Sequence, residues 1–160
     1  MIHIHSYEKW WIVLSVVMLA TLTTLIGLSA FSSGFQVPQP WAQVDPKTIK
    51  DSGDFVDANL GLHELTPGKY EAYVLAQASP WKFYPGELTI PAGSTVTFYV
   101  TSADVQHGFR IKDTNINLQV LPGQIARATY TFKEAGEYPY ICGEYCGVGH
   151  QNMFGKIIVK

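Results

Sequence analysis

Thr95-Val-Thr-Phe-Tyr-Val-Thr101 alternates small polar residues with larger apolar ones over most of its length, and all of its side chains are β-branched or aromatic. A period of two is the pattern of a β-strand that buries one of its faces. Arg127-Ala-Thr-Tyr-Thr-Phe132 repeats this pattern later in the chain. Pro91-Ala-Gly93 precedes the first stretch and Glu134-Ala-Gly136 follows the second, and both contain residues that favour turns. The two stretches therefore predict strands of a β-protein.

Similar short runs continue on both sides of these stretches, from residue 67 to the C-terminus. We expect eight strands, separated by turns that contain proline or glycine: Tyr70–Ala78, Glu87–Ile90, Thr95–Thr101, His107–Ile111, Ile116–Val120, Ala126–Phe132, Glu137–Cys142 and Gly155–Lys160. Short strands at this spacing indicate an antiparallel sandwich or barrel. This part of the 160-residue chain is long enough to bury one hydrophobic core.

The N-terminal part follows a different pattern, because the segment from Trp10 to Phe31 includes no charged side chain. As an α-helix this segment would be about 33 Å long, which is enough to cross the roughly 30 Å hydrocarbon core of a bilayer. We predict a transmembrane helix over residues 10–31, after a tail over 1–9. A cleaved secretory signal is the alternative, and Leu28-Ser-Ala30 resembles its cleavage site. The apolar core of a signal is usually only about 7 to 15 residues long, and the segment here is longer, which favours the transmembrane helix.

The charges indicate how the chain is organised. Lys9 is the only basic residue close to the apolar segment, so the positive-inside tendency favours a cytoplasmic N-terminus and an exported C-terminal domain.

We predict a connector over residues 32–66, where prolines are frequent and the net charge is −3, and a globular domain over 67–160 that is close to neutral. The total charge of −2 argues against a nucleic-acid-binding protein, which should show a basic face.

Candidate metal ligands are concentrated in one short segment near the C-terminus. Cys142, Cys146, His150 and Met153 follow one another closely, and the glycines among them disfavour a helix, so we expect a loop between two strands. Thiolate, imidazole and thioether groups together suit copper. His107, well before the first cysteine and at the start of a predicted strand, can supply a second imidazole.

The second cysteine distinguishes this segment from a mononuclear blue-copper loop, which needs one cysteine. Because two thiolates can each bridge two metals, we interpret the segment as a dinuclear copper site with one histidine on each copper and Met153 as a weak ligand. A backbone carbonyl can supply a sixth group, and Glu144 lies between the cysteines. Two alternatives are a Cys142–Cys146 disulfide, as exported cysteines often form, and structural zinc, which does not use methionine. Covalent haem attachment needs Cys-x-x-Cys-His, which this segment lacks.

The segment from Cys142 to Met153, together with His107-Gly-Phe109, resembles the dinuclear copper A motif of cytochrome c oxidase subunit 2. The likeness extends over roughly residues 70–160 and includes Glu87-Leu-Thr-Ile-Pro-Ala-Gly93. A single N-terminal helix, together with Thr114-Asn-Ile-Asn117, resembles the one-helix form of the subunit in B-type haem-copper oxidases.

This resemblance implies a cupredoxin-like Greek-key β-sandwich on the periplasmic or outer face of the cell membrane. It implies that two copper ions are bound by six residues, with Glu144 acting through its carbonyl: His107, Cys142, Glu144, Cys146, His150 and Met153. Electrons would come from cytochrome c or a similar donor and pass to haem in subunit 1, which would hold the haem and reduce oxygen. Membrane lipid would surround the helix.

The resemblance also suggests where electrons enter, because Trp81 lies in the aromatic stretch Pro80-Trp-Lys-Phe-Tyr-Pro85. The near-neutral domain favours apolar docking of the donor, with weak dependence on salt. Two other functions remain alternatives at this point. One is a stand-alone membrane-tethered copper-binding or electron-carrier protein, and the other is a component of a nitrous oxide or nitric oxide reductase system.

Overall fold

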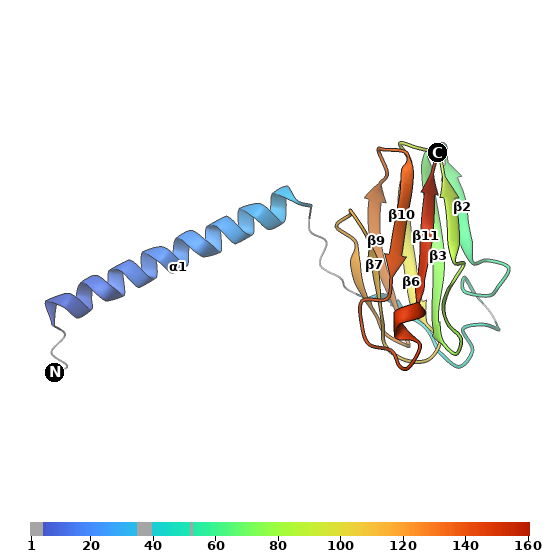
Figure 1. Cartoon of the computed structure of the whole chain (residues 1–160), viewed down its shortest axis with the longest axis horizontal. Helices are drawn as coiled ribbons and strands as arrows, with labels where there is room; N and C mark the ends of the chain where they lie inside the picture. Colours follow the sequence, from blue (N-terminus) through green and yellow to red (C-terminus); the bar gives the residue numbers. More distant parts are fainter. Residues whose placement is uncertain (1–4, 35–39, 52) are drawn as a thin grey trace. The chain divides into compact units, whose positions relative to one another are not determined.

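The computed structural model describes residues 5–34, 40–51 and 53–160. The chain divides into two compact units, Met1–Phe35 and Gln36–Lys160. The first contains the helix α1 (Ser6–Ser32), which buries none of its residues within the chain and is long and apolar enough to cross a membrane (Figure 1). It begins four residues before the predicted segment, where the Glu8 carboxylate accepts a hydrogen bond from the His5 backbone N–H at 2.7 Å.

Three threonines inside α1 hydrogen-bond their hydroxyl groups to the helix backbone. Thr21, Thr23 and Thr24 each donate a hydroxyl hydrogen bond of 2.8 Å to the carbonyl four residues earlier. In a bilayer an unpaired polar group costs several kcal/mol, and these bonds avoid that cost. The threonines are therefore compatible with a helix surrounded by lipid.

The second unit is a β-sandwich of two sheets (Figure 1). Among the described residues, the first sheet has the strand order β1 (Pro40–Gln43), β9 (Gln124–Thr131), β6 (Thr95–Ser102), β3 (Lys69–Ala78) and β2 (Gly61–Thr66), with β4 (Trp81–Tyr84) paired to β3. The second has the order β5 (Glu87–Ile90), β11 (Phe154–Val159), β10 (Gly136–Ile141), β7 (His107–Ile111) and β8 (Asn117–Val120).

All eight predicted strands are present, with ends that differ from the prediction by at most two residues. Most strand pairs are antiparallel, as predicted, but the sandwich is not purely so, because β3 pairs with β6 and β11 pairs with β5 in parallel. Between β3 and β6 the chain crosses to the other sheet to form β5 and then returns. A crossover of this kind brings two strands of one sheet into the same direction.

The predicted connector over residues 32–66 is largely part of the sandwich. β1 and β2 pair with strands of the first sheet, and the loop between them buries Ile49 and Phe55 to 4% and 2% exposure. These two side chains join Leu75, Tyr99 and Ile125 in a small second core. The prediction was wrong because isolated apolar residues among prolines and aspartates show no periodicity. Residues 35–39 and 52 of this stretch lie outside the described residues.

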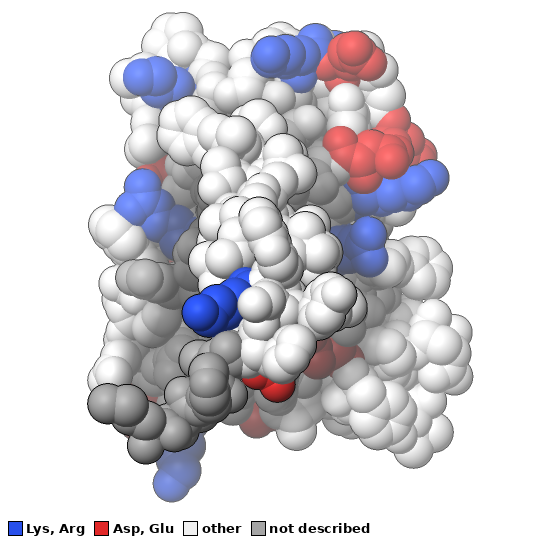
Figure 2. Space-filling model, turned by 90° about the vertical axis from the view of Figure 1, so that its left-hand side faces the viewer, with Lys and Arg blue, Asp and Glu red and all other residues white. Residues whose placement is uncertain are grey.

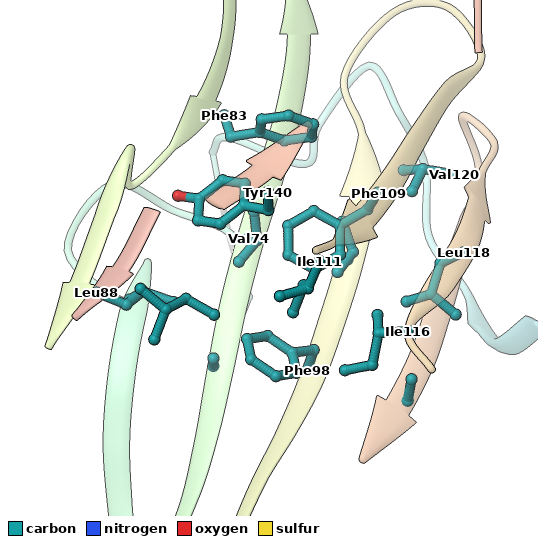
Figure 3. Packing of buried hydrophobic residues seen from close by; sticks show 14 of the residues in the cluster. Val74, Phe83, Leu88, Phe98, Phe109, Ile111, Ile116, Leu118, Val120 and Tyr140 are labelled. Atoms are coloured by element: carbon teal, nitrogen blue, oxygen red, sulfur yellow. The ribbon is translucent and has the colours of Figure 1, made fainter. Parts of the chain in front are cut away.

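The main core lies between the two sheets, where Val74 and Phe98 face Phe109, Ile111 and Tyr140 (Figure 3). The rings of Phe109 and Tyr140 are 5.1 Å apart, and the Tyr140 hydroxyl donates a 2.7 Å hydrogen bond to the carbonyl of Pro85. The same buried cluster includes both cysteines and Met153. The candidate ligands are therefore continuous with the rigid core.

Candidate metal centre

Three neighbouring strands position the candidate ligands. Cys142 directly follows β10, Met153 directly precedes β11, and His107 is the first residue of β7, which also pairs with β10. The Cys142 N–H donates a 3.1 Å hydrogen bond to the Met153 carbonyl and closes the base of the loop. A short 3₁₀ helix, η1 (His150–Asn152), lies within the loop. Residues from the ends of three strands therefore meet at one end of the second sheet.

The two thiols lie side by side, and each is close to one imidazole. The Sγ atoms of Cys142 and Cys146 are 3.7 Å apart, too far for a disulfide. His107 Nδ1 is 3.8 Å from Cys142 Sγ, and His150 Nδ1 is 3.6 Å from Cys146 Sγ. The structure thus brings His107, which lies 35 residues before Cys142 in the sequence, to the same place as Cys146 and His150.

Two weaker donors complete the arrangement. The Met153 sulfur is 3.8 Å from Cys146 Sγ, and the Glu144 carbonyl oxygen is 3.1 Å from Cys142 Sγ. Each thiol therefore has one imidazole nitrogen and one weak donor beside it. All six residues predicted as ligands lie at this place.

Asp104 supports His107 from behind, and sequence reasoning missed it. Its Oδ1 is 3.0 Å from His107 Nε2, and its carboxylate also accepts the backbone N–H groups of Ala78 and Val105 at 2.6 and 2.7 Å. A carboxylate on one ring nitrogen orients the imidazole and leaves the other nitrogen free for a metal. Burial tends to lower the pKa of His107, but hydrogen bonds with Cys142 and Asp104 outweigh it and raise that pKa.

The two thiols do not titrate alike. Burial tends to raise the pKa of Cys142, but hydrogen bonds from His107 and from the backbone N–H groups of Gly108 and Glu144 outweigh it and lower that pKa. Burial raises the pKa of Cys146, and its hydrogen bond with Cys142 raises it further. The pair therefore gives up one proton readily and holds the second, because two adjacent thiolates repel each other. A cation bound between them would remove that repulsion and release the second proton.

Trp81, predicted as the residue at which electrons enter, lies against the ligand loop. It is half-buried on β4, and its indole N–H donates a 3.2 Å hydrogen bond to the Cys146 carbonyl. Two large side chains of the same loop are exposed to solvent, Tyr145 with 79% and Val148 with 82% of their surface.

The donor set fits copper. His107, Cys142 and Cys146 offer ligand atoms that all lie within 4.8 Å of one another. Thiolates, imidazoles and a thioether are the ligands that copper sites use, whereas structural zinc is held by cysteine and histidine alone. The Met153 sulfur beside Cys146 therefore favours copper over zinc.

Comparison with known proteins gives the family. Residues 82–160 match the family model of the periplasmic domain of cytochrome c oxidase subunit II. Over 157 residues the chain is 42% identical to cytochrome c oxidase subunit 2 of Thermus thermophilus, covering 97% of this chain and 92% of that relative. The chain belongs to the cytochrome c oxidase subunit 2 family.

Solved structures agree with this membership. A chain of a haem-copper terminal oxidase dimer superposes with a TM-score of 0.76 and 33% identity, covering 96% of this subunit 2 chain and 99% of that chain. The periplasmic domain of subunit II of the Bradyrhizobium japonicum cytochrome oxidase shares the fold, with a TM-score of 0.51 and 21% identity over 56% of this chain. The predicted family and the predicted cupredoxin-like β-sandwich with one N-terminal apolar helix are confirmed.

Membership makes this chain a subunit of cytochrome c oxidase, and it implies a partner oxidase subunit in a haem-copper complex. Copper binding is implied by the family and agrees with the donor set. The apolar helix and the match to a periplasmic domain support a single-pass membrane protein with its sandwich on the outer face.

Proposed function

We propose that this subunit 2 is the point at which electrons enter a terminal respiratory oxidase, and that its sandwich holds a dinuclear copper A centre. The observation that carries the proposal is the pair of thiols 3.7 Å apart, each with its own imidazole nitrogen and its own weak donor. One blue-copper ion needs a single thiolate. Two half-sites that share two sulfurs suit two metal ions.

In this proposal the thiolates of Cys142 and Cys146 would hold both metals, and His107 and His150 would each hold one of them. Met153 and the carbonyl of Glu144 are the weak ligands. The copper pair, when bound, supplies a centre that takes up and releases one electron. The protein holds the ligands in a dry site, because Cys142 and Met153 are only 6% and 2% exposed and belong to the main core.

The donor in this proposal is cytochrome c or a similar carrier, and the acceptor is haem in subunit 1, which alone carries haem. Trp81 and the exposed Tyr145 and Val148 form the surface that the donor contacts. Basic and acidic side chains are interspersed on the face shown in Figure 2 rather than separated into large patches of one sign. The near-neutral charge of residues 67–160 supports apolar docking. We also place the N-terminus in the cytoplasm, on the evidence of Lys9, and lipid around α1.

Purification of the full chain from its native membrane tests the proposal. We expect two copper ions per chain, a delocalised mixed-valence spectrum, and co-purification with a polytopic subunit that carries haem. A single copper with the hyperfine pattern of one nucleus would refute the dinuclear centre. Recovery of the chain without any haem-bearing partner would instead favour a stand-alone copper carrier.

A further inference from the structure

The Trp81 indole is in close contact with the ligand loop at several points. Its N–H donates to the Cys146 carbonyl at 3.2 Å. A Cβ atom on Gly149 would lie 2.4 Å from Cδ2 and Cε3 of the ring, and one on Gly147 would lie 3.2 Å from Nε1. Real Cβ atoms essentially never approach another atom within 3.0 Å, so only glycine fits at position 149 while the ring is in place. The loop from Cys146 to Gly149 therefore packs closely against the indole.

The strand that carries the indole is fixed independently of the loop. β4 pairs with the end of β3, with Trp81 opposite Ala78 and Phe83 opposite Ala76. Phe83 is 2% exposed, and its ring packs edge-on against Phe109 at 5.5 Å. Trp81 therefore projects from the main core and gives the loop a rigid support.

The contacted segment joins two of the proposed ligands. Cys146 is its first residue, and His150 directly follows it. The His150 backbone N–H donates a hydrogen bond of 3.1 Å to the Gly147 carbonyl. Glycine-rich backbone has many accessible conformations and loses more entropy on ordering than other residues do. Without an external contact, this segment would not hold Cys146 and His150 in one arrangement.

We propose that Trp81 is a positioning residue of the copper centre, whose indole holds the Cys146–Gly149 segment so that Cys146 Sγ and His150 Nδ1 face the shared site. The copper part of this inference rests on the proposed function, whereas the contact itself belongs to the metal-free chain. If Trp81 were only a docking contact for the donor, its replacement would change only the rate at which the donor reduces the copper centre. Trp81 as a support of the loop also affects the properties of the site itself.

Hydrogen exchange of the metal-free full chain in detergent tests the support without copper. We expect the amides of residues 147–153 to exchange about fivefold faster in Trp81→Phe, the factor that corresponds to one hydrogen bond of ordinary net strength. Trp81→Leu also removes the ring and should give about tenfold or more. Trp41→Phe, a change at an exposed tryptophan of β1, is the control and should leave these amides unchanged. Equal exchange in wild type and Trp81→Leu would overturn the proposal.

A double-mutant cycle tests the consequence for the metal. Gly149→Ala alone should accelerate copper loss to a chelator by about tenfold or more, because the new methyl collides with the indole. In a Trp81→Ala background the same change should have little further effect. Gly136→Ala is the matched control, since its Cβ would make only an ordinary 3.9 Å contact with Tyr138.

The outcomes separate this inference from the proposed function. Additive effects of Gly149→Ala and Trp81→Ala would overturn the support by Trp81. So would a Trp81→Phe variant that is reduced more slowly by the donor while its hydrogen exchange and copper spectrum stay those of wild type. Failure of the wild type to bind a copper pair would refute the proposed function, and the exchange experiment would still decide whether Trp81 holds the loop.

Discussion

Asp104→Asn tests whether the carboxylate behind His107 sets the geometry of that ligand. In the native chain Oδ1 accepts the Val105 N–H and lies 3.0 Å from His107 Nε2, while Oδ2 accepts the Ala78 N–H. Asparagine has the same shape but only one oxygen, so its amino group must face an N–H donor in either orientation. The less costly orientation keeps the oxygen on His107 and leaves the Ala78 N–H without its acceptor.

The size of the effect follows from these bonds. A hydrogen bond to a charged group contributes about 1.5–3 kcal/mol. Because 30% of the Asp104 side chain is exposed, solvent screening reduces the expected loss of stability to about 1–2 kcal/mol. For the copper-loaded chain, loss of a carboxylate behind a metal-binding imidazole costs about 10–100-fold in metal affinity.

The loss should depend on pH. Burial tends to raise the pKa of Asp104, but hydrogen bonds from His107, Ala78 and Val105 lower it, so its contribution is lost as pH falls below about 4. The raised pKa of His107 adds stability that is complete below about pH 6.5 and is lost as pH rises through the folded value. The difference between wild type and Asp104→Asn is therefore greatest between about pH 4 and 6.5.

Urea unfolding of the metal-free full chain in detergent, at about pH 5.5 and about pH 8, measures this difference. Asp113→Asn is the control, because that carboxylate is 74% exposed and lies 3.9 Å from Lys112 in a surface pair of little energetic value. If Asp104→Asn costs no more than Asp113→Asn and shows no dependence on pH, Asp104 does not hold His107. Chelator competition with the copper-loaded protein supplies the second measurement.

Four further results are expected. Met153→Leu, a volume-conserving change at a buried site, should keep two copper ions and shift the reduction potential measured by voltammetry, and loss of all copper would contradict a weak ligand. Cys142→Ser should abolish the mixed-valence spectrum, because a hydroxyl is a poor bridge for soft copper; an unchanged copper count and spectrum would contradict its bridging role. Burial and Glu71 raise the pKa of Tyr73 to about 12, so as the pH rises the unfolded chain loses this proton before the folded chain does. The free energy of unfolding should therefore fall between about pH 10 and 12, and it should fall less in Tyr73→Phe, as measured by unfolding at a series of pH values. An equal fall with pH in wild type and Tyr73→Phe would contradict this assignment. Turnover with a cytochrome donor should depend weakly on ionic strength, and a steep loss between low and moderate salt would argue against apolar docking.

Most strands could be predicted because alternating apolar residues and flanking turn residues lie within or next to each strand in the sequence. Glu87–Ile90 and His107–Ile111 have the bounds that the sequence predicts, since turn-forming residues lie close before the first and β-branched or aromatic residues mark both. β4, a short run bordered by two prolines, is a strand only because β3 lies beside it. β1 likewise depends on β9, which comes much later in the chain. Pairing with a distant partner leaves no period in the short strand itself.

The same distinction separates the ligands from their supports. The cysteines, His150 and Met153 fall within one short segment, so their order and spacing carry the chemistry of the site. Asp104 is three residues from His107 but is one of 13 acidic residues, and its role depends on which way its carboxylate turns. Trp81 contacts a carbonyl 65 residues away. Such contacts are set by tertiary packing, which one sequence does not display.

The two supports act on different halves of the proposed centre. Asp104 orients His107, which with Cys142 extends directly from the ends of β7 and β10. Trp81 holds the glycine-rich segment that carries Cys146 and His150. Because the two sulfurs are only 3.7 Å apart and are proposed to bridge both metals, a shift in either half changes the geometry of both metal positions. A dinuclear centre with one half on strands and the other on a loop therefore needs a support for the loop as rigid as the sheet itself, and the indole, fixed by β4 to the main core, provides it.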